Sequence, residues 1–178
     1  MYARILVPID GGEHSHNGLK VACALAEHYK SKVILLCVTD EDIPEEVAAA
    51  AINEGIVRPS SYQEFVSTLG NASIATAQAQ AKRHAILSRV ANAIANEIAE
   101  RGASFATEQN VAEVLTLVRS GEADERIIEV ADGYNVDLIV IGSRGKEGLD
   151  ALLHPSVAET VRKRAKCHCL VLFPGEEG

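Results

Sequence analysis

The sequence is short of positive charge. It has 17 Lys and Arg against 25 Asp and Glu, which gives a formal net charge of −8 at pH 7. Nucleic acids and anionic membranes require a broad basic face on a protein that binds them. The composition therefore predicts no nucleic-acid partner and no membrane partner. A phosphate ligand is still compatible with it, because a phosphate needs only a small local site.

Long apolar runs are also lacking. No run of eighteen apolar residues occurs, so we expect no membrane-spanning helix. The first residues, MYARILVPIDGG, lack the apolar core and the small-residue cleavage site of a secretory signal. The cysteines are Cys23, Cys37, Cys167 and Cys169, and they lie in apolar segments rather than in a dense loop framework. We predict reduced, buried thiols in a cytoplasmic protein.

Short apolar runs alternate with segments of helical periodicity. Strands are predicted at 4–10, 32–39, 113–119, 136–142 and 169–173, and helices at 15–30, 72–101, 122–135 and 155–166. This order predicts an α/β fold in which helices sandwich one five-stranded parallel, Rossmann-like sheet. The segment 103–110 fits either a strand or a loop. We expect the last strand at an edge of the sheet, where it would pair with a second copy to form a homodimer.

Three residues are expected to mark helix ends. Ser15 could cap the first helix, because its side-chain oxygen can accept a hydrogen bond from an open first-turn amide. Gly102 is a candidate C-cap for the long helix that precedes it. Pro155 suits the first position of the helix at 155–166, where a missing N–H breaks no helical hydrogen bond.

Residues 40–81 break the strand and helix rhythm. They are rich in Ala and acidic residues, and their Pro, Gly and capping-box signals predict short helices. We interpret 40–71 as a helical insertion after the second strand, too short for a core of its own, while 72–81 extends the next helix. The prediction is a single domain over residues 1–178.

A glycine-rich stretch, GSRGKEG, follows the fourth predicted strand. In an open parallel sheet, ligands bind beyond the carboxyl ends of the strands, where the strand order reverses. Glycines let the backbone approach an anion, and successive amides form a concave array of donors. Arg144 and Lys146 would add charge at its rim, and Ser156 lies near a helix N-terminus, which also favours phosphate. The same glycines could equally serve only to shape a tight strand-to-helix connection.

Two segments carry a family resemblance. GSRGKEGLDALLHPSVAETVRKRAKCHCLVLF, together with RILVPIDGGEHS, resembles the universal stress protein family. The nucleotide pattern of that family is Gly, two residues, Gly, nine residues, then Gly and Ser or Thr. It falls here on Gly142, Gly145, position 155 and Ser156, and position 155 is Pro. The resemblance covers residues 2–39 and roughly 82–173 and leaves the insertion unmatched.

The resemblance implies a dimeric α/β domain that binds ATP, ADP or AMP, with or without Mg²⁺. Such a domain would regulate a stress response and hydrolyse ATP slowly at most. Asp10 would lie by the adenosine and Val38 would face the adenine. The implied nucleotide-binding residues are Pro8, Asp10, Val38, Gly142, Arg144, Gly145, Ser156 and Val157. Structural roles compete with these: Asp10 could cap a turn, Val38 could be a core residue, and Ser156 could only begin a helix.

Pro155 bears on the strength of any such binding. Its missing N–H removes one phosphate donor, at a cost of about 1.5–3 kcal/mol if that donor contacted a charge. The amides of Ser156 and Val157 still donate, while the proline restricts His154 to extended geometry. We therefore expect weakened but retained binding, better for AMP or ADP than for ATP.

Other motifs are weaker candidates. DGGEHS (10–15) lacks the Ser and Asp of the PP-loop pyrophosphatase loop that it resembles. CHC (167–169) could bind a metal with His14 or His154, although buried thiols suit this position better. His14 and His16 could touch a phosphate, but an exposed helix start suits them better. No nucleophile, base and orienting group stand together, so an efficient enzyme is not predicted. The alternative function is a nucleotide-free dimeric scaffold that uses the helical insertion to dock a partner.

Overall fold

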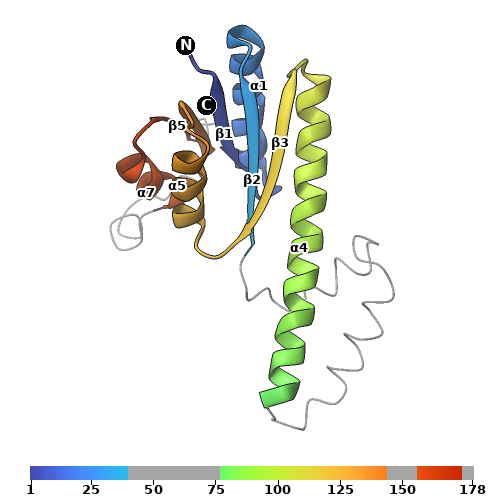
Figure 1. The fold of residues 1–178 in the computed structure, drawn as a ribbon. Helices are drawn as coiled ribbons and strands as arrows, with labels where there is room; N and C mark the ends of the chain where they lie inside the picture. Colours follow the sequence, from blue (N-terminus) through green and yellow to red (C-terminus); the bar gives the residue numbers. More distant parts are fainter. Residues whose placement is uncertain (40–76, 144–155, 174–178) are drawn as a thin grey trace, which may run out of the picture.

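The computed structural model describes residues 1–39, 77–143 and 156–173, which contain the predicted five-stranded parallel sheet (Figure 1). Each predicted strand is present within two residues of its predicted ends, so the fold class is confirmed. The elements in chain order are β1 (Arg4–Pro8), α1 (Glu13–Tyr29), β2 (Lys32–Thr39), α4 (Ala77–Glu108), β3 (Glu113–Ser120), α5 (Ala123–Gly133), β4 (Leu138–Gly142), α7 (Val157–Arg164) and β5 (His168–Leu172).

The strand order across the sheet is β3-β2-β1-β4-β5. The chain places β2 and β3 on one side of β1 and then crosses to the other side for β4 and β5. The order therefore reverses between β1 and β4, which are direct neighbours with Ile5 opposite Leu138. β5 lies at an edge of the sheet, as predicted.

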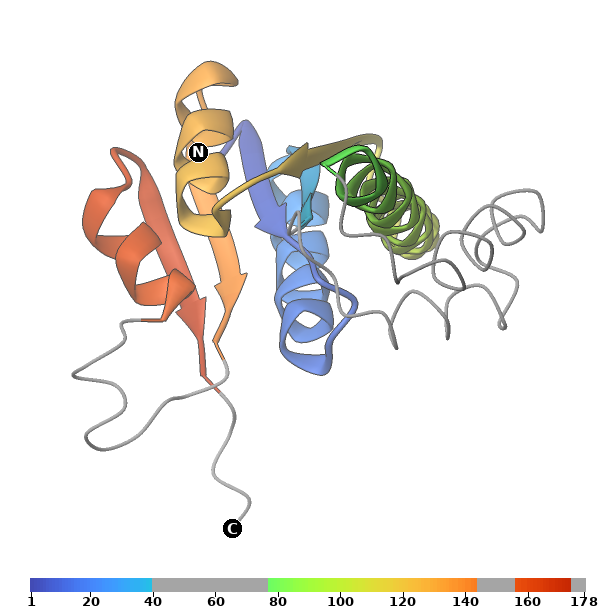
Figure 2. The same cartoon turned by 90° about the horizontal axis from the view of Figure 1, so that it is seen from below.

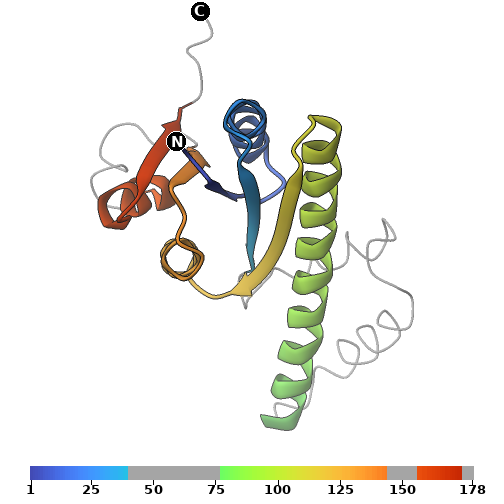
Figure 3. The ribbon, with the colours of Figure 1, turned by 45° about the horizontal axis from the view of Figure 1, so that its top comes forward.

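Successive strand residues face opposite sides, so the sheet buries two apolar clusters. Val7 and Leu35 belong to the cluster under α1 and α4, while Leu6 and Leu36 belong to the cluster with residues of α5 and α7. All four are fully buried. Figure 3 shows α1 and α5 on opposite faces of the sheet, and Figure 2 shows α7 beside β5. Helices on both faces explain why the central strands β2, β1 and β4 are almost continuously apolar.

The long helix α4 continues further than predicted. The predicted C-cap, Gly102, lies inside it, and the helix includes residues 103–108 of the segment read as strand or loop. A Cβ at Gly102 would lie 3.1 Å from the side chains of Ile9 and Leu35. The glycine therefore permits close contact between helix and sheet and does not end the helix.

The end of α4 follows from burial and from backbone geometry. Ala106 is fully buried and Phe105 packs on the core, so the apolar stripe of the helix continues past Gly102. Asn110 then takes a positive φ of 62°, a left-handed conformation that Asn tolerates better than most residues. The chain turns there towards β3.

Two other helix starts differ from the prediction. α1 begins at Glu13 with Gly12 as its N-cap and no capping side chain, so Ser15 lies in the first turn instead. α7 begins at Val157 with Ser156 as its N-cap, so position 155 precedes the helix rather than opening it. A Ser near a helix start suits either the N-cap or the first turn, and only the hydrogen-bond partner of its side chain distinguishes the two positions.

The predicted insertion at 40–71 lies outside the described residues, as does Pro155. The single-domain extent and the insertion therefore remain predictions. None of the helices in the described part of the chain combines the length and the apolar character that a bilayer crossing requires.

Candidate functional site

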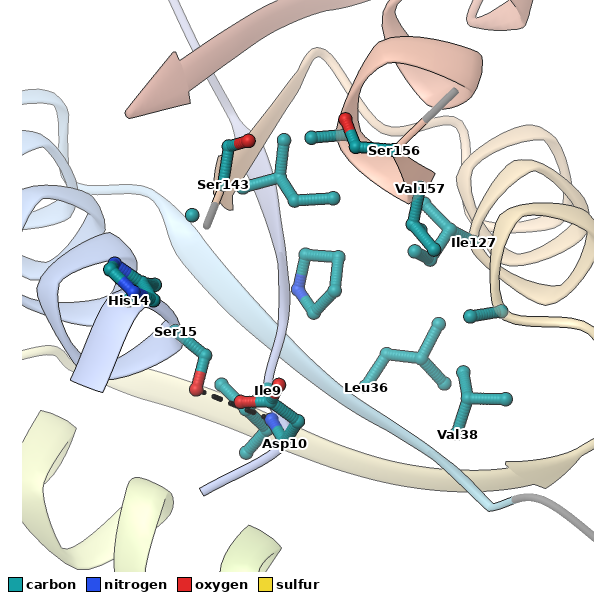
Figure 4. A pocket seen from close by; sticks show the side chains of 15 residues that line it. Ile9, Asp10, His14, Ser15, Leu36, Val38, Ile127, Ser143, Ser156 and Val157 are labelled. Carbon is teal, nitrogen blue, oxygen red and sulfur yellow. Dashed lines mark hydrogen bonds between the residues drawn. The ribbon is translucent and has the colours of Figure 1, made fainter. Parts of the chain in front are cut away.

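A cavity of about 470 Å³ opens where the strand order reverses, at the carboxyl ends of β1 and β4 (Figure 4). It lies on the face of the sheet that α5 and α7 cover, because Leu36, Ile127 and Ile141 all belong to that cluster. The described residues that line it are Pro8, Ile9, Asp10, His14, Ser15, Leu36, Val38, Ala123, Ile127, Ile141, Gly142, Ser143, Ser156, Val157 and Ala158.

The turn between β1 and α1 is held by its own polar groups. The Asp10 carboxylate accepts a hydrogen bond from the Gly12 amide at 2.9 Å. Ser15 Oγ donates to the Gly12 carbonyl at 2.9 Å and accepts from the Asp10 amide at 3.3 Å. Gly11 has a φ of 79°, which favours glycine. Asp10 therefore caps the turn and lines the cavity at once.

Gly142 ends β4 where α1 passes closest to it. A Cβ on Gly142 would lie 2.1 Å from the carbonyl oxygen of His14, a distance that no side chain can take. A Cβ on Gly18 would in turn lie 3.4 Å from the Gly142 nitrogen. Packing of α1 against β4 thus requires a glycine at 142, whatever the residue does for a ligand. The buried Ser143 follows, and its amide donates to the Leu172 carbonyl at 2.8 Å.

The first turn of α7 faces the cavity. Ser156 Oγ accepts from the Glu159 amide at 3.2 Å, and the Thr160 amide donates to the Ser156 carbonyl at 3.0 Å. The amides of Val157 and Ala158 precede the first helical hydrogen bond and so have no acceptor within the helix. Together with the partial positive charge of a helix N-terminus, they suit an anion. The Ser156 hydroxyl can donate its proton to the same anion.

The negative charge of Glu159, in the same turn, is paired with a lysine. Lys163 Nζ lies 2.9 Å from Glu159 Oε1, and the hydrogen bond and charge of Lys163 hold the pKa of Glu159 below its usual range. The carboxylate stays ionised, but its charge is paired with a cation one turn away. None of the described lining residues is Lys or Arg. The predicted cations of the rim, Arg144 and Lys146, lie outside the described residues.

The wall of the cavity opposite the β1–α1 turn is apolar. Leu36 and Val38 of β2 lie there together with Ile127 of α5, and we call these three residues the apolar wall (Figure 4). The connection that leads to α5 is tied to β2, because the Gly121 amide donates to the Thr39 carbonyl at 3.1 Å. A flat aromatic ring suits this wall, since binding would remove apolar surface on both partners from water.

The sequence predicted part of this cavity. The predicted residues that line it are Pro8, Asp10, Val38, Gly142, Ser156 and Val157. Arg144 and Gly145 lie outside the described residues. Sequence reasoning missed several of the lining residues, among them Ser143 and Ile127. Ser143 directly follows an apolar strand and could have been found from that position, whereas the helical pattern around Ile127 carries no such signal.

The two histidines of the first helix differ from each other. His14 is half-buried and lines the cavity, so its expected place on an exposed helix start is wrong. His16 is exposed and its ring packs on Phe105, with 4.9 Å between the ring centroids. His14 differs because it lies on the side of α1 that contacts Gly142.

The four cysteines are free thiols, but the predicted burial is found only for Cys23 and Cys37. Cys23 and Cys37 are buried, and burial raises the pKa of each to about 11. Cys167 and Cys169 are only half-buried, and burial raises their pKa as well. Within the described ranges, no three His, Cys, Asp or Glu side chains gather so as to hold a metal ion. His154, the other metal ligand considered for 167–169, lies outside those ranges.

Comparison with known families identifies the fold. A model of the universal stress protein family matches residues 1–172. The chain belongs to the universal stress protein family. The resemblance seen in the two terminal segments is thereby confirmed, and the match to universal stress proteins also runs through the region between them.

Individual relatives agree with this assignment. Universal stress protein MJ0577 of Methanocaldococcus jannaschii is 29% identical over 173 residues, which are 97% of this chain and 95% of that protein. A solved universal stress protein in complex with cAMP covers 96% of this chain and 97% of its own, with a TM-score of 0.65 and 18% identity. A family protein from Arabidopsis thaliana with AMP bound covers 98% and 94%, with a TM-score of 0.63 and 13% identity. Both structures show that the fold is shared.

Proposed function

We propose that this chain binds an adenine nucleotide in the cavity between β1 and β4 and acts as a regulatory module in a stress response, with ATP hydrolysis slow at most. One observation carries the proposal. The described residues among those that the resemblance assigns to the nucleotide are Pro8, Asp10, Val38, Gly142, Ser156 and Val157, and all of them line one cavity. Universal stress proteins of the same fold have been solved with cAMP and with AMP, which supports this class of ligand.

The walls of the cavity offer different groups to the different parts of a nucleotide. Adenine would lie against the apolar wall, beside Leu36 and Val38. Ribose hydroxyls would donate hydrogen bonds to the Asp10 carboxylate. A phosphate would accept from the Val157 amide and the Ser156 hydroxyl at the N-terminus of α7.

The donors at α7 favour few phosphates over many. Pro155 has no amide hydrogen to offer. The donors that the start of α7 offers to a phosphate are therefore the amides of its first turn and the Ser156 hydroxyl, a set small enough to suit one or two phosphates. We therefore propose AMP or ADP as better ligands than ATP. If ATP binds with Mg²⁺, Asp10 is the carboxylate among the described lining residues that would face the metal. The remaining Mg²⁺ ligands would be phosphate oxygens and water.

The test identifies any small molecule that the purified protein carries and then measures affinity. Heat denaturation should release an adenine nucleotide that co-elutes with an AMP, ADP or ATP standard. Isothermal titration calorimetry should then show binding of AMP to the emptied protein. Asp10→Asn keeps an oxygen for the Gly12 amide but loses the charge towards ribose, and it should weaken AMP binding roughly ten- to a hundred-fold. Glu97→Gln, on the opposite face of the sheet, is the control and should bind AMP normally.

The alternative function predicts a different result. A nucleotide-free scaffold would release no adenine compound and would show neither a heat of AMP binding nor a thermal shift with ATP and Mg²⁺. That outcome would overturn the proposal. ATP hydrolysis by the unaltered chain that is lost in Gly145→Asp would instead show that slow hydrolysis is a function of the protein.

We also propose that two copies pair through β5. This strand lies at a sheet edge. Leu170 within it is 36% exposed, and Phe173 directly after it is 70% exposed. Apolar edge strands favour pairing with another chain. Light scattering after size-exclusion chromatography should give twice the chain mass of 19.0 kDa, and Leu170→Lys should halve it. A dimer that survives this substitution would place the interface elsewhere.

We propose a cytoplasmic location, which the four free thiols support because the cytoplasm keeps thiols reduced. Fractionation of cells that express the tagged chain tests this location. Recovery from an oxidising compartment with disulfides formed would contradict it.

A further inference from the structure

Helix α7 carries the proposed phosphate contacts but has few anchors of its own. It is eight residues long, and its buried residues are Ala158 and Val161. A helix this short is marginal by itself, so its position depends on tertiary contacts. Any tilt of α7 would move the amides of Val157 and Ala158 relative to the apolar wall. The contacts that hold α7 therefore set the geometry of the site.

Two ion pairs reach α5, one from Arg164 at the end of α7 and one from Lys166 just beyond it, and the two helices lie side by side (Figure 1). Arg164 Nη1 donates to Asp124 Oδ2 at 2.7 Å, and Lys166 Nζ donates to Asp132 Oδ2 at 2.6 Å. Asp124 directly follows the lining residue Ala123, so the first pair acts close to the cavity. Asp132 lies at the other end of α5, away from the cavity.

The Arg164–Asp124 pair differs from ion pairs that lie within one helix or between neighbouring strands. The pair of Arg101 and Glu97 lies within one helix, and the pair of Lys32 and Glu113 joins two strands that are already hydrogen-bonded. Neither can set the spacing of two helices. The Asp124 side chain is also only 24% exposed, against 39% for Glu97 and 71% for Glu113, although its partner Arg164 is 49% exposed. Water and salt therefore screen its interaction less.

We propose that Arg164 and Asp124 are positioning residues that hold the phosphate-binding start of α7 against the apolar wall. The inference rests on the proposed nucleotide function and names the pair on which the phosphate part of that site depends. Neither residue lines the cavity, so each acts through the placement of α7 and not through the ligand. Loss of the pair weakens ligands that reach α7 through a phosphate and spares ligands that do not.

The experiment compares AMP with adenosine by calorimetry on Asp124→Asn, Arg164→Gln and the double variant. Each single substitution should raise the Kd for AMP roughly two- to five-fold, and the double variant should add little. Adenosine has no phosphate, so its Kd should change less. The two single substitutions alter the net charge in opposite directions, so a loss of AMP affinity in both identifies positioning and not long-range attraction. Arg164→Lys, which keeps the charge, should restore most of the AMP affinity.

Control variants and folding measurements separate the outcomes. Glu97→Gln on α4 removes an ion pair on the face of the sheet opposite the cavity and should leave the Kd for AMP unchanged. Circular dichroism establishes that each variant is folded before titration. If the unaltered chain binds AMP and Asp124→Asn binds it equally well or more tightly, the positioning inference is overturned while the nucleotide function stands. If the unaltered chain binds no nucleotide, the proposed function fails and this inference fails with it.

Discussion

The two faces of the sheet are covered in different ways. On one face, α1 and α4 are 17 and 32 residues long, and Gly18 and Gly102 bring their backbones close to the strands. On the other face, α5 and α7 are 11 and eight residues long and are joined by ion pairs. The cavity lies on this second face. Close glycine contacts therefore hold the scaffold, while the site occupies the face whose short helices leave room at the strand ends.

The largest expected effects come from Leu35 and Leu36. These neighbours in β2 are both fully buried, and they belong to opposite clusters. Replacement of either by Ala should lower the free energy of unfolding by about 2–5 kcal/mol, measured by urea denaturation. Only Leu36→Ala should also weaken AMP binding, because only Leu36 lines the cavity. An equal loss of AMP affinity in Leu35→Ala would show that the two faces are not independent.

A smaller effect is expected where α1 meets β4. Gly142→Ala would place a methyl group 2.1 Å from the His14 carbonyl oxygen, so helix and strand must separate. We expect a loss of about 1–3 kcal/mol in the free energy of unfolding. The matched control is Gly133→Ala at the end of α5, where an added Cβ meets nothing within 4 Å. Urea denaturation of the control should show unchanged or slightly raised stability. A well-tolerated Gly142→Ala would mean that close packing is not what the glycine serves.

The N-terminus of α7 should respond more modestly. Ser156→Ala removes the acceptor of the Glu159 amide and should lower the free energy of unfolding by about 1 kcal/mol. Ser156→Asp keeps a capping oxygen and should retain stability in urea denaturation, but its charge would repel a phosphate. Ser156→Asp should therefore weaken the binding of AMP and leave the binding of adenosine, which has no phosphate, little changed. If the substitution affects both affinities equally, the phosphate does not lie at this turn.

The smallest effect near neutral pH concerns Cys23 and Cys37, which lie in the cluster under α1 and α4. Burial raises the pKa of both thiols to about 11, while an exposed thiol in the unfolded chain ionises near 8.5. The unfolded state therefore loses its protons first as pH rises. Stability from this source is complete below about pH 8.5 and falls as pH rises towards 11. Urea midpoints at pH 8 and pH 10 should differ more in the unaltered chain than in Cys37→Ala. The same difference in both proteins would assign the decline to other groups.

The strands and part of the site could be predicted because their signals are local. A run such as residues 33–37 is apolar at every position, which indicates a strand covered on both faces. Asp10 and Ser156 could be placed by their spacing from such strands and from the glycines. Gly102 could not be read correctly, because a glycine for close packing and a glycine for a helix end look alike in the sequence. Only the contact with Ile9 and Leu35 distinguishes them.

Local patterns in the sequence were enough to locate the strands and most of each helix, since periodicity and turn residues act over a few neighbouring positions. Three other features became visible only in the folded chain: the His14 carbonyl excludes a side chain at 142, Ile127 completes the apolar wall, and Arg164 reaches Asp124 across 40 positions of the chain. Each of these depends on how helices and strands far apart in the sequence pack against one another, and no local pattern records that packing.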